Sequence, residues 1–211
     1  MRLEVEDLTV HRGGRLVIAG LGFAVDRGEA LILRGPNGVG KSTLLRALAG
    51  LAPPSGGRIT LTPDLALEDH VALTGHLDAI KLQMSVAENL RFWAGLHGGD
   101  ADAALIGAGL EALADRPAGF CSAGQKRRLG LARLLLAGRA IWLMDEPTVS
   151  LDREAEAWLT GQVRTHCAGG GMAVIATHVA LDLPAARVLR MQRPEPQAAH
   201  GTDPFLQGRW G

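Results

Sequence analysis

Residues 35–43 read Gly-Pro-Asn-Gly-Val-Gly-Lys-Ser-Thr, and they constrain the fold of this chain more than any other stretch. They fit the phosphate-binding loop pattern of Gly, four residues, Gly, Lys and Ser or Thr. An apolar run at 30–33 precedes the loop and a helical pattern at 43–51 follows it. Glycines let successive N–H groups point at phosphate oxygens, and the helix dipole favours the same anion. This strand–loop–helix context disfavours an ordinary glycine-rich turn.

Two residues of the loop have specific expected roles. Lys41 would reach the β- and γ-phosphates of a bound nucleotide, and the hydroxyl of Ser42 would ligate Mg²⁺. The predicted nucleotide-binding residues of the loop are Gly35, Pro36, Asn37, Gly38, Val39, Gly40, Lys41, Ser42 and Thr43.

Composition sets the size and class of the protein. The 211 residues and the 47% hydrophobic content suffice for one large domain, or for a domain with a subdomain. Acidic and basic residues balance at 22 each, so bulk charge gives no support for nucleic-acid binding and no nucleic-acid partner is expected, although a local basic patch is not excluded. Cys121 and Cys167 lie far apart without a C-x-x-C or histidine-rich partner, so neither a zinc site nor a disulfide framework is indicated.

The apolar stretches are too short to cross a bilayer, because Arg, Asp, Glu or Gly interrupts them. Residues 1–10 alternate apolar and charged side chains as a strand does, and they lack the apolar core of a signal peptide. We therefore expect a reducing compartment and no direct membrane insertion. Any association with a membrane would go through a partner.

The order of elements predicts an α/β fold of the P-loop NTPase type, with a mostly parallel sheet and an antiparallel β portion at the N-terminus. The unbroken apolar strands indicate a sheet buried on both faces. Strand signals stop from about 81 to 137, where three helical segments at 86–96, 101–114 and 123–136 predict an inserted helical subdomain. We expect a single domain over 1–192 and a tail over 193–211 without periodicity. The expected strands cover residues 3–10, 16–25, 30–33, 58–61, 71–74, 140–144, 173–177 and 187–191.

A second half of the site follows the apolar run at 140–144, which ends in Asp145, Glu146 and Pro147. In a phosphate-loop fold, an acid at the carboxyl end of a neighbouring strand lies beside the nucleotide. Asp145 is therefore expected to hold the Mg²⁺ shell, and Glu146 to orient or deprotonate the attacking water. Taken alone, the same three residues would fit a helix N-cap and turn.

Residues 121–128 read Cys-Ser-Ala-Gly-Gln-Lys-Arg-Arg ahead of an apolar helix. Here the chain resembles the ATP-binding cassette (ABC) ATPases, whose signature is Leu-Ser-Gly-Gly-Gln. Ser122, Gly124 and Gln125 match, whereas Cys121 replaces the leucine and Ala123 the first glycine. Without the other motifs, this stretch would fit a helix capped by Ser122 with basic surface residues. In the family the signature faces the γ-phosphate bound by a second copy, so the resemblance implies ATP as ligand, ATPase activity and an ATP-sandwiched dimer.

Two further motifs agree with that family. Residues 148–152 look like the D-loop, which runs along the dimer seam and ends in Asp152. The segment 176–178 ends an expected strand and looks like the switch histidine, so the resemblance implies that His178 bonds the γ-phosphate and Glu146.

The sequence departs from the family at the base-stacking position. Cassettes usually place an aromatic residue, often tyrosine, before the phosphate loop, but this chain contains no tyrosine. His11 and Arg12 stand at the corresponding stretch, and either could lie flat on adenine, Arg12 through its planar guanidinium.

The second departure is the Q-loop, whose glutamine contacts Mg²⁺ and the attacking water. The spacing back from 84–90 puts His76 at that position with Leu77 beside it; an imidazole can hydrogen-bond there and a leucine cannot. Residues 75–81 and 88–93 resemble the CcmA-like ATPase subunit of the cytochrome c maturation system, which is often described as a haem exporter. His76 is accordingly expected among the catalytic residues, with Glu146 and His178.

This resemblance implies a cytoplasmic ATPase bound to an integral membrane permease subunit at the inner face of the bacterial cytoplasmic membrane. Its ATP cycle would serve haem export or the release of a haem-loaded periplasmic chaperone; the sequence does not choose between them. Three alternatives remain: an ABC ATPase for another substrate, a soluble ABC protein acting on ribosomes or DNA, and a scaffold that binds ATP without turnover. The single cassette and neutral charge disfavour the second, and Glu146 disfavours the third.

Overall fold

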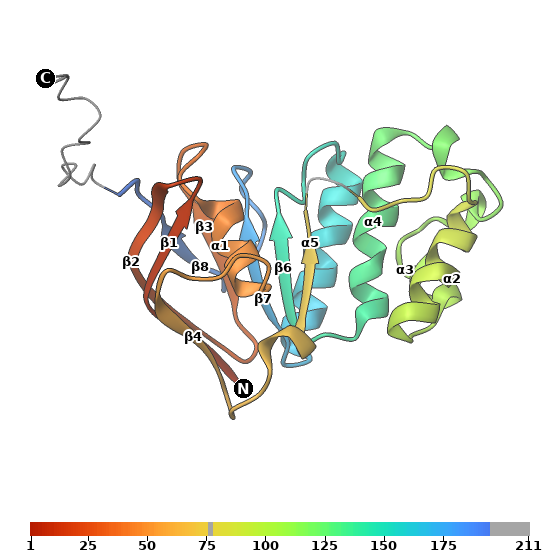
Figure 1. The fold of residues 1–211 in the computed structure, drawn as a ribbon. Helices are drawn as coiled ribbons and strands as arrows, with labels where there is room; N and C mark the ends of the chain where they lie inside the picture. Colours follow the sequence, from red (N-terminus) through yellow and green to blue (C-terminus); the bar gives the residue numbers. More distant parts are fainter. Residues whose placement is uncertain (76–77, 195–211) are drawn as a thin grey trace, which may run out of the picture.

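The computed structural model describes residues 1–75 and 78–194, and it contains two sheets with helices between and beside them (Figure 1). An antiparallel sheet has the strand order β2-β1-β4, and a parallel sheet has the order β5-β6-β7-β3-β8. The strands are β1 (Arg2–Arg12), β2 (Arg15–Asp26), β3 (Ala30–Arg34), β4 (Gly56–Thr62), β5 (Val71–Thr74), β6 (Ile141–Asp145), β7 (Met172–Ala176) and β8 (Arg187–Arg190). The predicted fold class and all eight predicted strands are confirmed.

The parallel sheet is buried on both faces, which explains its unbroken apolar strands. In β6, Ile141 and Leu143 pack into one core with the antiparallel sheet and α1 (Lys41–Leu48). The alternate residues Trp142 and Met144 pack into a second core with α4 (Ala123–Ala137) and α5 (Arg153–Ala168). Since side chains alternate along a strand, a sheet between two cores requires apolar residues at every position.

The chain between β5 and β6 is helical in its described part. It contains α2 (Val86–His97), α3 (Ala101–Gly107) and α4, which share a third core and lie at one end of the molecule (Figure 1). The 3₁₀ turns Glu111–Leu113 and Ala118–Phe120 lie between α3 and α4, and a third, Leu67–Asp69, precedes β5. No helix among residues 1–75 and 78–194 is long and apolar enough to cross a membrane.

Two predicted helix ends are wrong. The helix expected over 101–114 ends at Gly107, and the chain passes through Gly109 with φ 62°. The helix expected to reach residue 51 ends at Leu48, before Gly50 with φ 71°. In both places a glycine takes the left-handed backbone that terminates a helix, a signal outweighed in the sequence by the leucines and alanines around it.

Candidate functional site

The phosphate-binding loop joins β3 to α1, and its conformation requires glycine at two points. Gly35 has φ 150°, and a Cβ there would lie 2.7 Å from the carbonyl oxygen of Met191. Gly40 has φ 108°, and its Cβ would lie 2.9 Å from Cγ1 of Val17. Gly40 also caps α1 without a side-chain hydrogen bond, so no side chain covers the first N–H groups of the helix. The loop and helix together present backbone donors suited to an anion.

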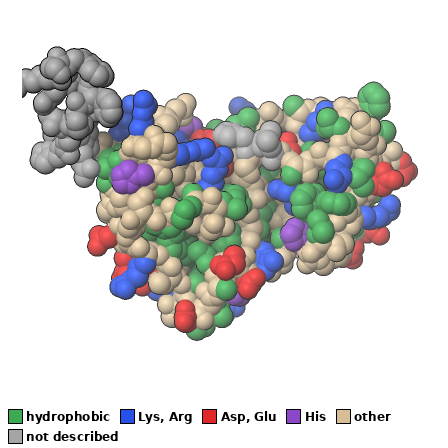
Figure 2. Space-filling model, in the orientation of Figure 1, with side chains coloured by type: hydrophobic (Ala, Val, Ile, Leu, Met, Phe, Trp, Pro, Cys, Tyr) green, Lys and Arg blue, Asp and Glu red, His purple; other side chains and the backbone are tan. Residues whose placement is uncertain are grey.

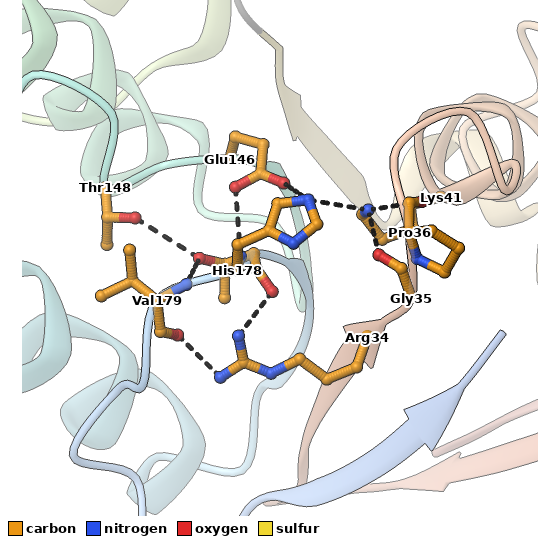
Figure 3. Close-up of polar contacts among 9 residues, drawn as sticks. Arg34, Gly35, Pro36, Lys41, Glu146, Thr148, His178 and Val179 are labelled. Atoms are coloured by element: carbon orange, nitrogen blue, oxygen red, sulfur yellow. Dashed lines mark hydrogen bonds and ion pairs between the residues drawn. The ribbon is translucent and has the colours of Figure 1, made fainter.

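Lys41 opens α1 with a buried side chain, 7% exposed. Its Nζ lies 2.9 Å from the carbonyl oxygen of Gly35 and 3.3 Å from that of Pro36. The same atom lies 3.1 Å from Nε2 of His178 (Figure 3). The ammonium group is thus held at the centre of the loop by two carbonyls and one imidazole.

The carboxyl end of β6 supplies two adjacent acids. Asp145 ends the strand and is 6% exposed. Glu146 has φ 46°, which is uncommon for a residue with a side chain, and its N–H donates to the carbonyl of Ala176 at 2.8 Å. The alternative interpretation of this stretch was a helix N-cap and turn. The turn is present at 147–150, but the N-cap is wrong, because α5 begins later and Asp152 caps it through the N–H of Ala155 at 2.8 Å.

His178 lies just after β7, opposite Glu146. Oε1 of Glu146 is 3.3 Å from Nε2 of His178, and Oε2 accepts the backbone N–H of His178 at 3.3 Å (Figure 3). The side chain of His178 is 47% exposed and that of Glu146 is 15% exposed, so the pair opens to solvent on the histidine side. A ligand arriving from solvent would meet the imidazole before the carboxylate.

Arg34 fixes the loop that carries His178, and the sequence analysis did not single it out. It ends β3, and its Nη1 donates to the carbonyl of Thr177 and its Nη2 to that of Val179, both at 2.7 Å (Figure 3). These two carbonyls flank His178. The arginine therefore ties the base of the phosphate-binding loop to both sides of the histidine.

One cavity of about 730 Å³ brings most of the predicted site together. It unites the phosphate-binding loop, the two acids at the carboxyl end of β6, the histidine after β7 and the end of β1. The lining residues are Arg12, Val17, Asn37, Gly38, Gly40, Lys41, Ser42, Thr43, Asp145, Glu146, Thr148, Val149, His178 and Val179. The other three predicted loop residues, Gly35, Pro36 and Val39, belong to the same loop but do not line the cavity.

The cavity also bears on the base-stacking position and on the metal. Arg12 lines the cavity, whereas Nδ1 of His11 lies 3.1 Å from Oγ of Ser55. Of the two candidates for stacking on adenine, Arg12 is therefore the one that lies beside the phosphate-binding loop.

Ser42 and Asp145 line the cavity together, and their hydroxyl and carboxylate oxygens are the hard ligands that Mg²⁺ prefers. This donor set fits a Mg²⁺ ion that takes its other ligands from phosphates and water.

The signature residues 121–125 are not among those that line this cavity, whereas Thr148 and Val149 of the D-loop stretch are. Ser122 and Gln125 form a reciprocal capping box at the start of α4: Gln125 N–H donates to Ser122 Oγ at 3.2 Å, and Ser122 N–H to Gln125 Oε1 at 2.9 Å. Gly124 lies against the chain after β6, since a Cβ there would be 3.0 Å from the carbonyl oxygen of Ser150. His76 and Leu77 lie outside the described residues.

The sequence of this chain is similar to those of known proteins. The model of the ABC transporter family matches residues 18–149. The cytochrome c biogenesis ATP-binding export protein CcmA of Ruegeria pomeroyi is 58% identical over 186 residues, which cover 88% of this chain and 89% of that protein. The protein of the same name from Cereibacter sphaeroides is 50% identical over 205 residues, 97% of this chain and 95% of that protein.

Among solved structures, cbiO1 from Clostridium perfringens, part of the ABC transporter complex cbiONQ, matches with a TM-score of 0.77 at 27% identity, over 90% of this chain and 84% of that one. Sequence and fold agree, and the resemblance drawn from the motifs is confirmed. The chain belongs to the ABC transporter family and, within it, to the group of cytochrome c biogenesis ATP-binding export proteins named CcmA.

Proposed function

We propose that this chain binds ATP with Mg²⁺ and hydrolyses it as the ATPase subunit of an ABC complex in cytochrome c biogenesis. The observation that carries the proposal is the single cavity in which Lys41, Asp145, Glu146 and His178 meet. The names of its relatives supply the pathway, since they are cytochrome c biogenesis ATP-binding export proteins.

Each side chain has a role that follows from its chemistry. Lys41 and the N–H groups at the start of α1 bind the phosphates, and Arg12 lies on the adenine. Ser42 and Asp145 would hold Mg²⁺, which would neutralise charge on the phosphates. Glu146 orients the attacking water and accepts its proton.

His178 links the γ-phosphate to Glu146 through hydrogen bonds. Its imidazole lies between Lys41 Nζ at 3.1 Å and Glu146 Oε1 at 3.3 Å. A γ-phosphate bound at Lys41 would therefore lie beside the imidazole. His178 then serves as a hydrogen-bonding partner to both the phosphate and the general base.

A second copy of the chain completes the site. The signature residues Ser122, Gly124 and Gln125 do not line this cavity, whereas Val149 and Val179 line it with 53% and 43% exposure. In an ATP-sandwiched dimer, the partner copy's signature helix would cover this open side and direct its N-terminal dipole at the γ-phosphate. Asp152 would lie along the seam.

The complex is completed by an integral membrane permease subunit, which holds this chain at the cytoplasmic face of the bacterial inner membrane.

We propose that residues 1–192 form one ABC ATPase domain with a helical subdomain over about 81–137 and that 193–211 form a tail. Acidic and basic side chains both occur on the face drawn in Figure 2, so this face is not the uniformly basic kind of surface that binds nucleic acid. ATP turnover then drives haem export or release of a haem-loaded periplasmic chaperone.

A tagged chain purified from native membranes tests this function. We expect an integral membrane permease of the cytochrome c biogenesis complex to copurify, and we expect deletion of the chain to abolish haem-staining c-type cytochromes. Wild type should restore them and Lys41→Ala should not. Copurification of a permease from another transport system, together with normal cytochromes in the deletion strain, would contradict the proposal.

A further inference from the structure

Arg127 is a buried arginine in the second turn of α4, 5% exposed, and no role in the proposed function uses it. A guanidinium carries five N–H donors in a fixed fork and cannot lose its charge in a protein. At this depth an unpaired guanidinium would be strongly unfavourable, so its partners are informative. It makes five hydrogen bonds to described residues, which fall into two groups.

The first group is the backbone turn that carries the catalytic acids. Nη2 donates to the carbonyl of Asp145 at 3.3 Å and to that of Glu146 at 2.9 Å. Nε donates to the carbonyl of Pro147 at 3.1 Å. Three consecutive carbonyls thus converge on one side chain. This turn includes Glu146 at φ 46°, a backbone conformation that persists only where its surroundings hold it.

The second group is the segment that leaves β5. Nη1 of Arg127 donates to the carbonyl of Gly75 at 2.9 Å and to Oδ1 of Asp78 at 2.7 Å. Asp78 also packs against the next turn of α4, because a Cβ on Gly130 would lie 2.7 Å from Cβ of Asp78. Arg127 and Gly130 are three positions apart, so the same face of α4 holds this segment twice.

The fork therefore ties three parts of the fold together at the back of the cavity: α4, the segment at 75 and 78, and the turn after β6. Glu146 is held from the other side by its own N–H bond to Ala176. The backbone of this turn is thus held on both sides, and from it the carboxylate of Glu146 lies toward His178. A displacement of Asp78 would be transmitted to the turn after β6 through the planar guanidinium of Arg127.

We propose that Arg127 is the positioning residue for Glu146, and that its ion pair with Asp78 makes the position of the general base depend on the position of Asp78. The inference rests on the proposed function, since Arg127 acts through Glu146. Lysine keeps the charge at this position but has three donors on a flexible stem and cannot bridge five acceptors.

Single-turnover ATP hydrolysis and nucleotide affinity, measured on the full chain with its copurified permease, provide the test. Arg127→Lys should lower the hydrolysis rate about 10- to 100-fold, the effect of a small displacement of a catalytic group, and leave the Kd for ATP within about twofold. Asp78→Ala removes one arm of the fork and should lower the rate less. Arg133→Lys is the matched control: it changes another arginine of α4, which contacts Trp93 and the carbonyl of Gly130, and should leave the rate unchanged.

The combination with Glu146→Gln separates positioning from a structural effect. If Arg127 acts through the carboxylate, Arg127→Lys in the Glu146→Gln background should cause no further loss of rate. An independent loss of the same size in both backgrounds, or a wild-type rate in Arg127→Lys, would overturn the inference while leaving the proposed function standing. Should Arg127→Lys fail to fold, Asp78→Ala is compared in the two backgrounds under the same criterion. Absence of hydrolysis by the wild-type complex would instead contradict the proposed function.

Discussion

Nζ of Lys41 lies 3.1 Å from Nε2 of His178, so the lysine that opens α1 and the histidine after β7 contact each other directly. The same Nε2 lies 3.3 Å from Oε1 of Glu146. One ring nitrogen cannot accept a hydrogen bond from the lysine and donate one to the carboxylate at the same time. We expect a γ-phosphate to draw Lys41 away from His178, which frees the imidazole to bond Glu146.

Lys41→Ala should abolish ATP binding or turnover while the fold stays intact, because the change removes a charge directed at phosphate and no core contact. Binding is measured with a fluorescent ATP analogue, and the fold by circular dichroism. Arg46→Ala removes a positive charge from the exposed side of the same helix and should bind as wild type does. A wild-type hydrolysis rate in Lys41→Ala would remove the phosphate-loop assignment.

Arg34→Ala should lower turnover about tenfold or more, because the loop on both sides of His178 loses its two hydrogen bonds from the guanidinium. Amide hydrogen exchange at 177–179 should become faster in the same variant. Arg190→Ala serves as the control, since Arg190 pairs with Arg34 in the neighbouring strand and its side chain is exposed. Equal exchange rates in both variants would show that Arg34 does not hold this loop.

The stability of the fold should depend on His166 below pH 6.5. Desolvation by burial lowers the pKa of His166 from its usual value of 6.5, although its ring nitrogen lies near the carbonyls of Met172 and Ala140. The unfolded chain then binds the proton more readily than the folded one, so the free energy of unfolding falls as pH drops below 6.5. The stabilisation is fully present above that pH.

The measurement is urea unfolding between pH 7 and 5, roughly the range in which histidine titrates. His166→Phe keeps the aromatic stack on Trp142, whose ring centroid lies 3.9 Å away, and should flatten the dependence on pH. His97→Phe is the matched control, because His97 also stacks on a tryptophan, Trp93. If both variants keep the wild-type slope, the burial of His166 does not set it.

The sequence predicted the strands well because the parallel sheet lies between two cores. Residues such as Leu143 and Met144 must then both be apolar, and their runs stand out. The motifs of the candidate site could also be predicted from the sequence, since the phosphate-binding loop, Glu146 and His178 follow strands of that same sheet. The two wrong helix ends came from Gly109 and Gly50, whose left-handed backbones are visible only in the structure.

Arg34 and Arg127 could not be found from the sequence. Arg127 stands between Lys126 and Arg128, where an interpretation as basic surface residues was open, yet it is buried. Both arginines bind mainly backbone carbonyls, up to 145 positions away in the chain, and any residue type supplies a carbonyl. A motif can mark a side chain that meets a ligand; it does not mark the side chain that holds the backbone behind it.

The ATPase rate of Glu146→Gln tests the central claim most directly. If Glu146 is the general base of this cavity, turnover of the complex should fall by roughly 10²- to 10⁴-fold, while ATP still binds and light scattering detects an accumulated dimer. Turnover at the wild-type rate in Glu146→Gln would contradict the account, because the acid that the fold brings opposite His178 would then have no part in hydrolysis.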